Sequence, residues 1–390
     1  MSLVYDARDA RRGQAGFHAL IVGVSAYRYL PPVGSVPTPE SCGMTQLSCA
    51  AYSAYTVYEW LLQNTDTLCA PLATCRLLLS PTDDETRRNP AVRHATAATL
   101  NEFLRAACEW RADVAQNRDN AAFFYFVGHG VIRNRMDQIL LLEDFNDGMG
   151  SLLRNSFDVN SLYHGMAPSH RYPDIGRTQF YFIDACRNRP SQFADYQRLS
   201  PTPAFDVYLP DMPDDRTAPL FFAATVGGLA YAEPNTQTFF SKALIHCLQG
   251  AAAEPDAHGR WRVTSTTLQR MLGATIRELL QSHHAEQQIT VHGVGRDAVL
   301  CYLPQPPQAQ VQLFLNPREA HHHAQVQVRD GEGALLHDLP PPIPIPYETR
   351  LTPGYYQFEL WRNTEPRTAP DKQVIREVRY PITVVELEAL

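Results

Sequence analysis

Four mainly apolar runs of five to seven residues, each followed by polar residues, constrain the fold of this chain more than any other feature. They span residues 18–24, 75–79, 121–127 and 179–183. Apolar runs that do not alternate with polar residues are typical of strands buried on both faces of a sheet. Segments with helical spacing of apolar residues lie between them, at 47–62, 96–115 and 158–166. This order predicts an α/β fold with a mainly parallel sheet flanked by helices.

The same pattern continues towards residue 303. We expect a further buried strand at 219–224, helices at 239–248 and 264–283, and strands at 289–291 and 298–303 that close the sheet. Residues 80–90, which contain Asp83-Asp84-Glu85, are expected to form an exposed turn. A cation site is less favoured there, because the triplet lacks the spaced ligands of a calcium loop.

The character of the sequence changes after residue 303. A Pro-rich polar linker at 304–310 precedes short segments with strand character and regular turns. We therefore predict a domain at 1–303, a linker at 304–310 and a small all-β sandwich at 311–390 that serves as an accessory domain.

Two of the apolar runs are followed by residues whose side chains could take part in a reaction. Residues 121–127 are followed by Gly128-His129-Gly130, and residues 179–183 by Asp184-Ala185-Cys186. Neighbouring parallel strands would bring both ends to the edge where open α/β sheets bind their ligands. A Cys/His pair is the minimum for a thiol nucleophile, because the imidazole lowers the thiol pKa and later protonates the leaving amine. The alternative is that Cys186 is a buried structural cysteine.

The two motifs together resemble the caspase/metacaspase clan of cysteine peptidases. The caspase signature Q-A-C-[RQG]-G has its histidine about 50 residues upstream, and here His129 precedes Cys186 by 57 residues. The first signature position is Asp184 instead of Gln, as in metacaspases and bacterial caspase-like proteins. The resemblance covers roughly residues 17–303. It implies a cysteine-type endopeptidase with Cys186 as nucleophile, His129 as base and acid, and an oxyanion hole formed by the backbone N–H groups of Gly130 and Cys186.

The resemblance also implies a preference for Arg or Lys before the cut bond, because the metacaspase residue that matches Asp184 lines that pocket. The family's second pocket acid falls on Ser53 here, so this preference depends on one carboxylate. An alternative role for Asp184 is to orient its loop by accepting backbone N–H bonds. A preference for Asp would instead need arginines, and Arg28 and Arg187 are the nearby candidates.

The segment 191–218 is longer than ordinary loops and is rich in proline and acidic residues. We expect it to pack poorly and to lie near the nucleophile. In the caspase clan, chains are commonly cut after the catalytic Cys on activation. The hypothesis is therefore a zymogen that is activated by cleavage at Arg198 or Arg216, and the alternative is a passive surface loop.

Composition limits the partners. The net charge is −7 and no Lys/Arg cluster occurs, so binding of nucleic acid or an anionic membrane through bulk charge is not expected. The eight cysteines form no C-x-x-C pair, and His321-His322-His323 lacks accompanying ligands, so neither a metal site nor a cofactor is expected. Without an apolar leader or span, we expect a cytoplasmic protein.

Two functional classes are therefore compared. The first is a peptidase acting on protein substrates, with the β-sandwich as the contact for an activating protease or regulator. The second is a catalytically weak caspase-like scaffold that uses the crevice and the sandwich for binding. The presence of both His129 and Cys186 favours the enzyme.

Overall fold

The structure is a computed structural model that describes residues 2–389 except 135–136, 208–211, 234–235, 284, 294 and 363–368. Contacts divide the chain into two compact units. The first comprises Met1–Cys247 with Arg262–Tyr302, and the second Leu248–Trp261 with Leu303–Leu390. Residues 248–261 group with the C-terminal unit, whereas the predicted boundary lay at residue 303.

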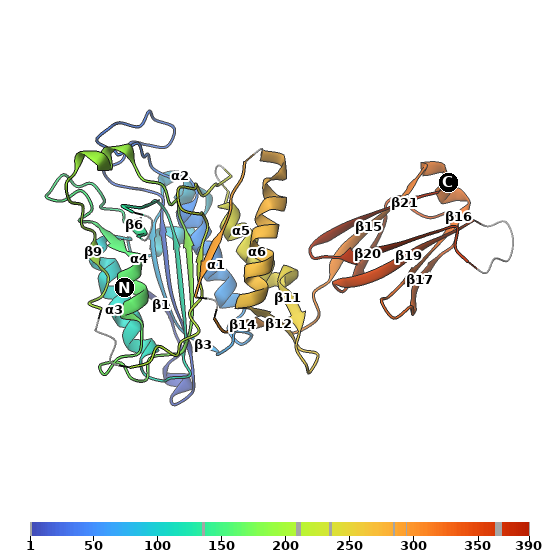
Figure 1. Ribbon diagram of the computed structural model, residues 1–390, viewed down its shortest axis with the longest axis horizontal. Helices are drawn as coiled ribbons and strands as arrows, with labels where there is room; N and C mark the ends of the chain where they lie inside the picture. Colours follow the sequence, from blue (N-terminus) through green and yellow to red (C-terminus); the bar gives the residue numbers. More distant parts are fainter. Residues whose placement is uncertain are drawn as a thin grey trace. The chain divides into compact units, whose positions relative to one another are not determined.

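A seven-stranded sheet forms the centre of the first unit (Figure 1). Its order is β1-β3-β2-β4-β8-β10-β13, with β2, β3, β4, β8 and β10 parallel to their neighbours and the edge strands β1 and β13 antiparallel. The bounds are β1 Leu3–Asp6, β2 Phe17–Val24, β3 Leu72–Ser80, β4 Ala121–Val127, β8 Thr178–Asp184, β10 Leu220–Phe222 and β13 Thr290–His292. The mainly parallel sheet is as predicted, because strands that are apolar throughout can only be buried on both faces.

Helices cover both faces of this sheet (Figure 1). Helices α1 (Ala50–Gln63), α5 (Phe239–His246) and α6 (Ser265–Leu280) lie on one side, and α3 (Leu100–Val114) and α4 (Val159–Gly165) on the other. The approach of α1 is close, since a Cβ added to Gly23 of β2 would lie 2.6 Å from Cβ of Ala54. Only glycine fits at position 23, and this close contact holds α1 against β2.

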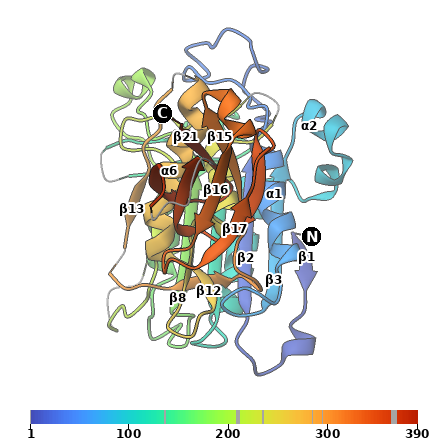
Figure 2. The same cartoon turned by 90° about the vertical axis from the view of Figure 1, so that its right-hand side faces the viewer.

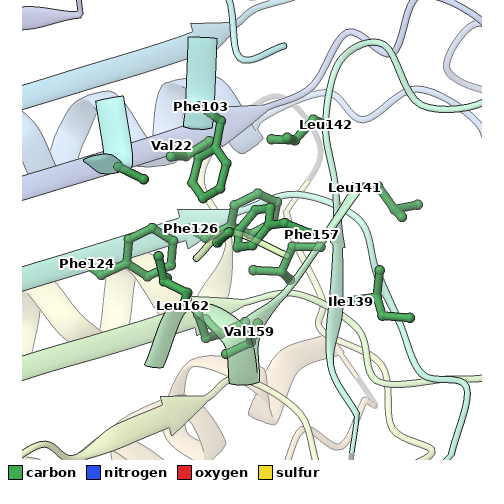
Figure 3. Packing of buried hydrophobic residues seen from close by; sticks show 14 of the residues in the cluster. Val22, Phe103, Phe124, Phe126, Ile139, Leu141, Leu142, Phe157, Val159 and Leu162 are labelled. Carbon is green, nitrogen blue, oxygen red and sulfur yellow. The ribbon is translucent and has the colours of Figure 1, made fainter. Parts of the chain in front are cut away.

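An aromatic core fills the α3 face and supports the carboxyl ends of the strands (Figure 3). Phe103 of α3 stacks on Phe157 with ring centroids 4.0 Å apart, and Phe124 and Phe126 of β4 contact the same ring. Phe157 belongs to a second small sheet of order β5-β6-β7-β9, with bounds Gly130–Val131, Ile139–Leu141, Ser156–Asp158 and Thr202–Pro203. Truncating a buried Phe of this kind to Ala costs about 3–5 kcal/mol.

Two expectations for this unit are wrong. Residues 83–88 form a short helix, α2 (Asp83–Arg88), instead of an exposed turn, and Glu85 is buried. Thr82 and Glu85 form a capping box, a signal that was present in the sequence. The strand at 298–303, β14 (Val299–Tyr302), does not close the central sheet. It pairs with β12 (Trp261–Thr264), while β13 forms the sheet edge.

The second unit is a sandwich of two sheets (Figure 2). One sheet has the order β18-β15-β21 and the other β17-β16-β19-β20. Burial alternates along β15 and β16, so each sheet presents one apolar face to a shared core. The bounds are β15 Ala309–Asn316, β16 Ala324–Arg329, β17 Leu335–Leu339, β18 Tyr347–Leu351, β19 Gly354–Arg362, β20 Lys372–Val378 and β21 Ile382–Glu388; β11 (Ala253–Pro255) also belongs to this unit.

Candidate active site

His129 and Cys186 lie next to one another at the ends of two paired strands. Strands β4 and β8 are parallel, with Val127 opposite Asp184, and a further bridge pairs Val131 with Asn188. The two members of each pair are 57 residues apart in the sequence, and so are His129 and Cys186. His129 therefore lies opposite Cys186, midway between the two pairs. The predicted meeting of the two motifs at one edge of the sheet is therefore confirmed.

The glycines on either side of His129 allow this close approach. A Cβ added to Gly130 would lie 2.7 Å from the carbonyl oxygen of Cys186 and 2.8 Å from Cβ of Ala185. A Cβ at Gly128 would lie 2.8 Å from the hydroxyl oxygen of Tyr27. Real Cβ atoms do not come this close to other atoms, so both positions need glycine for steric reasons.

The imidazole of His129 is held by a backbone carbonyl. Its Nε2 lies 2.7 Å from the carbonyl oxygen of Thr45, in the long loop between β2 and α1. A carbonyl only accepts hydrogen bonds, so Nε2 carries a proton and the neutral ring has its lone pair on Nδ1. Burial lowers the pKa of His129, and the Thr45 carbonyl partly opposes this shift. The ring is therefore neutral near pH 7 and able to take up a proton.

The thiol of Cys186 is covered by a loop that follows β10. The N–H of Ala230 donates to Sγ at 3.3 Å, and Sγ lies 3.9 Å from the carbonyl oxygen of Ala230. Two backbone hydrogen bonds also join this loop to Arg187, the residue after Cys186. The N–H of Gly227 donates to the Arg187 carbonyl oxygen at 2.7 Å, and the N–H of Arg187 donates to the Gly228 carbonyl oxygen at 3.0 Å. Burial raises the pKa of the thiol, and the Ala230 N–H lowers it. Within the described chain, no hydrogen bond joins Sγ to the ring of His129.

Asp184 is almost fully buried and lies two residues before Cys186. Its Oδ2 accepts hydrogen bonds from the hydroxyls of Tyr125, at 3.1 Å, and Thr238. Its Oδ1 is buried without a hydrogen-bond partner. Burial raises the pKa of Asp184 to about 7, although both hydroxyls lower it. No described cation pairs with this carboxyl.

Thr238 joins Asp184 to Ser53, the other predicted pocket residue. The N–H of Thr238 donates to Oγ of Ser53 at 3.0 Å, and Ser53 Oγ in turn donates to the carbonyl of Cys49. The hydroxyl of Thr238 also caps α5 by accepting from Ser241 N–H. The structure therefore brings Asp184 and Ser53 into one network on the α1 face of the sheet.

The two arginines considered for an Asp preference do not lie beside Asp184. Arg28 is half exposed and forms an ion pair with Glu143. Arg187 points to the opposite face of the sheet, where its guanidinium lies 4.1 Å from the ring centre of Phe222. Its Nε and Nη1 are buried without partners, and burial lowers its pKa.

The segment 191–218 is better packed than expected, apart from residues 208–211, which lie outside the described chain. Phe193, Leu199 and Phe205 are buried in the core. The side chain of Arg216 is 1% exposed and pairs with Asp214, so a peptidase could not engage it in the folded protein. Residues 194–198 are all exposed, and they include Arg198. The expectation of poor packing is wrong for the buried parts, and Arg198 is the accessible one of the two predicted cleavage sites.

Four contact residues were not found from the sequence: Thr45, Ala230, Thr238 and Tyr27. Thr45 and Ala230 act through their backbone, which leaves no side-chain pattern to detect. Thr238 had a detectable signal, since a threonine directly before an apolar helix is a favoured N-cap.

The histidines at 321–323 lie in the C-terminal unit. His321 Nδ1 lies 3.0 Å from the Ile343 carbonyl oxygen, and no metal-holding cluster occurs among the described residues.

The strand order and the His–Cys pair at its carboxyl edge define the class: an α/β protein of caspase-like architecture. A family model described as the caspase domain matches residues 18–291. The chain therefore belongs to the caspase domain family of peptidases.

Individual similarities are more distant. The chain is 25% identical over 362 residues to a probable protease from a Desulfuromonadales bacterium, covering 87% of this chain and 40% of that protein's length. It is 23% identical over 308 residues to an uncharacterized protein of Sinorhizobium fredii, covering 78% of this chain and 86% of that protein. Among solved structures, caspase-1 from Spodoptera frugiperda matches with a TM-score of 0.41 and 12% identity, covering 75% of this chain and 94% of that one.

None of the described helices is both long and apolar enough to cross a membrane.

Proposed function

We propose that this chain is a cysteine endopeptidase that cleaves proteins after Arg or Lys residues, with Cys186 as nucleophile and His129 as acid and base. The observation that carries the proposal is the common register of these residues at the ends of β4 and β8. The bond from His129 Nε2 to Thr45 O adds to it, because it leaves Nδ1 as the nitrogen that takes up a proton.

The reaction follows from these groups. The proton of Cys186 passes to His129 Nδ1, and the thiolate attacks the carbonyl carbon of the substrate. The N–H groups of Gly130 and Cys186 would stabilise the oxyanion, and the imidazolium gives its proton to the leaving amine. Water, deprotonated by His129, then hydrolyses the thioester and releases the carboxylate product and the free thiol. The Ala230 N–H, which donates to Sγ and lowers the pKa of the thiol, would favour the thiolate.

The preference for basic residues is supported by the state of Asp184. Its free Oδ1 and its raised pKa mark a buried acid without a counter-charge. An Arg or Lys side chain would favour the ionised carboxylate, whereas an apolar or acidic side chain would leave it unpaired at a cost of several kcal/mol. Ser53 contributes a hydroxyl instead of a second charge, and its bond to Thr238 supports a role in shaping this pocket.

Activation by cleavage within 191–218 belongs to the same proposal. The exposed residues 194–198 are accessible to a protease, and the carbonyl of the following Leu199 is held by Arg133 at 2.7 Å. Cleavage after Arg198 would free the chain between η3 (Ser191–Asp195) and Leu199. An activating protease or regulator could bind through the C-terminal sandwich.

A second candidate function is a caspase-like binding protein without catalysis. The observation that favours it is the thiol itself, which bonds to Ala230 instead of His129. The two candidates differ in the reactivity of Cys186 towards a substrate-like reagent.

The test is a peptide that ends in an arginine chloromethyl ketone. The endopeptidase should be alkylated at Cys186, as mapped by mass spectrometry, and a peptide library should show Arg or Lys before the cut bond. Absence of labelling at Cys186 in both the intact chain and the chain cut in 191–218 would support the binding protein. A profile dominated by Asp would overturn the specificity.

A further inference from the structure

Tyr27 lies in the loop directly after β2 and contacts the backbone of His129. It is fully buried, and its hydroxyl oxygen accepts the N–H of His129 at 2.6 Å. The same hydroxyl lies 3.4 Å from the carbonyl oxygen of Leu141. Leu141 N–H in turn donates to the carbonyl of His129 at 3.1 Å. Tyr27, His129 and Leu141 thus form a closed set of hydrogen bonds around both backbone groups of the histidine.

The ring of Tyr27 also packs against the imidazole. The two ring centres are 4.9 Å apart with an interplanar angle of 43°. This contact restricts the tilt of the imidazole, while the Thr45 carbonyl restricts the position of Nε2. The side chain of Tyr27 therefore meets His129 at its backbone and at its ring.

The approach of the hydroxyl depends on Gly128. A Cβ at this position would lie only 2.8 Å from the Tyr27 hydroxyl oxygen. Burial raises the pKa of Tyr27, the hydrogen bond from His129 opposes this, and the charge of Cys186 adds to the rise. The phenol therefore keeps its proton over the pH range in which a cysteine peptidase works.

We propose that Tyr27 is a positioning residue for the reaction: its hydroxyl and ring fix His129 so that the imidazole can take the proton of Cys186. This inference rests on the proposed peptidase function. Tyr27 touches no substrate atom, and its effect is exerted through His129. Because displacements of about 1 Å can cost about a hundredfold in rate, such a contact is expected to show in the kinetics.

Tyr27→Phe removes the hydroxyl and keeps the ring. The His129 N–H and the Leu141 carbonyl then lose a buried partner, and the His129 backbone shifts to find another. We expect kcat on an Arg peptide to fall about 10- to 100-fold, with KM within about twofold. The control is Tyr181→Phe, which removes another buried hydroxyl, bonded to Gln179 and remote from the site, and should leave kcat unchanged.

A measurement without substrate separates this inference from the proposed function. The rate of Cys186 alkylation by iodoacetamide is followed between pH 5 and 9 by mass mapping, for wild type, His129→Ala, Tyr27→Phe and Tyr181→Phe. The Tyr27→Phe profile should shift towards that of His129→Ala, and Tyr181→Phe should follow wild type. A purely structural role would alter the melting temperature of both tyrosine variants without moving the profile.

The outcomes are distinct. If Tyr27→Phe keeps the wild-type kcat and alkylation profile while His129→Ala changes both, Tyr27 has no positioning role although the peptidase proposal stands. If wild type cleaves no peptide, either intact or cut in 191–218, but the profiles shift as stated, the peptidase proposal fails and the coupling of Tyr27 to the pair stands. If His129→Ala leaves alkylation unchanged, both fail. Should Tyr27→Phe not fold, Gly128→Ala keeps the hydroxyl but displaces it, and the same shift is expected.

Discussion

His129 and Cys186 lie at equivalent positions just beyond the ends of β4 and β8, between the pair Val127–Asp184 and the bridge Val131–Asn188. The pairing continues beyond the strands themselves, because Ile132 N–H donates to the carbonyl of Asn188 at 3.0 Å. The backbone pairing therefore sets the distance between the main chains of His129 and Cys186, and the side-chain rotamers set the distance between the imidazole and the thiol.

Loss of either residue should remove the activity. Cys186→Ala and His129→Ala are each expected to lower kcat on an Arg peptide by about 10³-fold or more, because the two groups act as a unit. Steady-state kinetics measures the effect. Cys108→Ala, which changes an exposed cysteine on α3, is the matched control and should keep wild-type rates. Wild-type cleavage by Cys186→Ala would exclude this cysteine as the nucleophile.

Asp184 should contribute a loss of stability as pH rises from about 4 to about 7, which is measured as the difference between wild type and Asp184→Asn. In the unfolded chain Asp184 loses its proton near its ordinary pKa of 3.8, whereas in the fold burial holds its pKa at about 7. Between these values the folded state binds more protons, so raising the pH favours unfolding, on the order of 4 kcal/mol in total. Urea unfolding at pH 4.5 and 7.5 measures the change.

Asp184→Asn provides the control for this pH dependence. Asn cannot ionise, so the stability difference between the two pH values should shrink by the contribution of Asp184 while the fold persists. The same variant should lose activity on Arg peptides while Cys186 stays reactive to alkylation, because loss of the Asp184 charge removes one cause that raises the thiol pKa. An unchanged pH dependence in Asp184→Asn would show that the carboxyl titrates normally in the fold.

Gly130 and Gly273 should respond in opposite directions to the same substitution. Gly130→Ala places Cβ 2.7 Å from the Cys186 carbonyl oxygen, so it should destabilise the fold by about 1–3 kcal/mol and lower kcat. Gly273 lies within α6, where the nearest atom to an added Cβ is 3.5 Å away. Gly273→Ala should therefore stabilise by about 0.5–1 kcal/mol without a change in kcat. Chemical denaturation and kinetics on both variants test the pair, and tolerance of Gly130→Ala would contradict the close approach.

Cleavage in the segment 191–218 should occur after Arg198 and not after Arg216. Limited proteolysis by a trypsin-like enzyme, followed by mass mapping, should locate the cut in the exposed residues 194–198. Arg198→Gln should abolish this cut, and Arg93→Gln, at another exposed arginine, should not. A first cut at Arg216 would mean that its buried ion pair opens readily. Equal activity of intact and cut chains on an Arg peptide would end the zymogen hypothesis.

The sequence alone determined the central architecture and the placement of His129 and Cys186 at one edge of it. Apolar runs without alternation require burial on both faces, so strands such as Ala121–Val127 and Thr178–Asp184 had to lie inside a parallel sheet covered by helices. Glycines on both sides of His129 and the polar stop after residue 183 then placed the two motifs at one edge. Strand-like segments with regular turns likewise predicted an all-β C-terminal unit, in which burial alternates along β15.

The tertiary structure decided everything that depends on contacts between distant segments. Thr45 and Ala230 reach the pair through backbone groups, which every residue carries and no pattern distinguishes. The burial of Arg216 and the exposure of Arg198 depend on which of them finds a partner in the folded core, although both lie in one polar segment. The same reason applies to Asp184. Burial in the folded protein raises its pKa, and the hydroxyls that partly oppose this shift come from Tyr125 and Thr238, which lie 59 and 54 positions away along the chain.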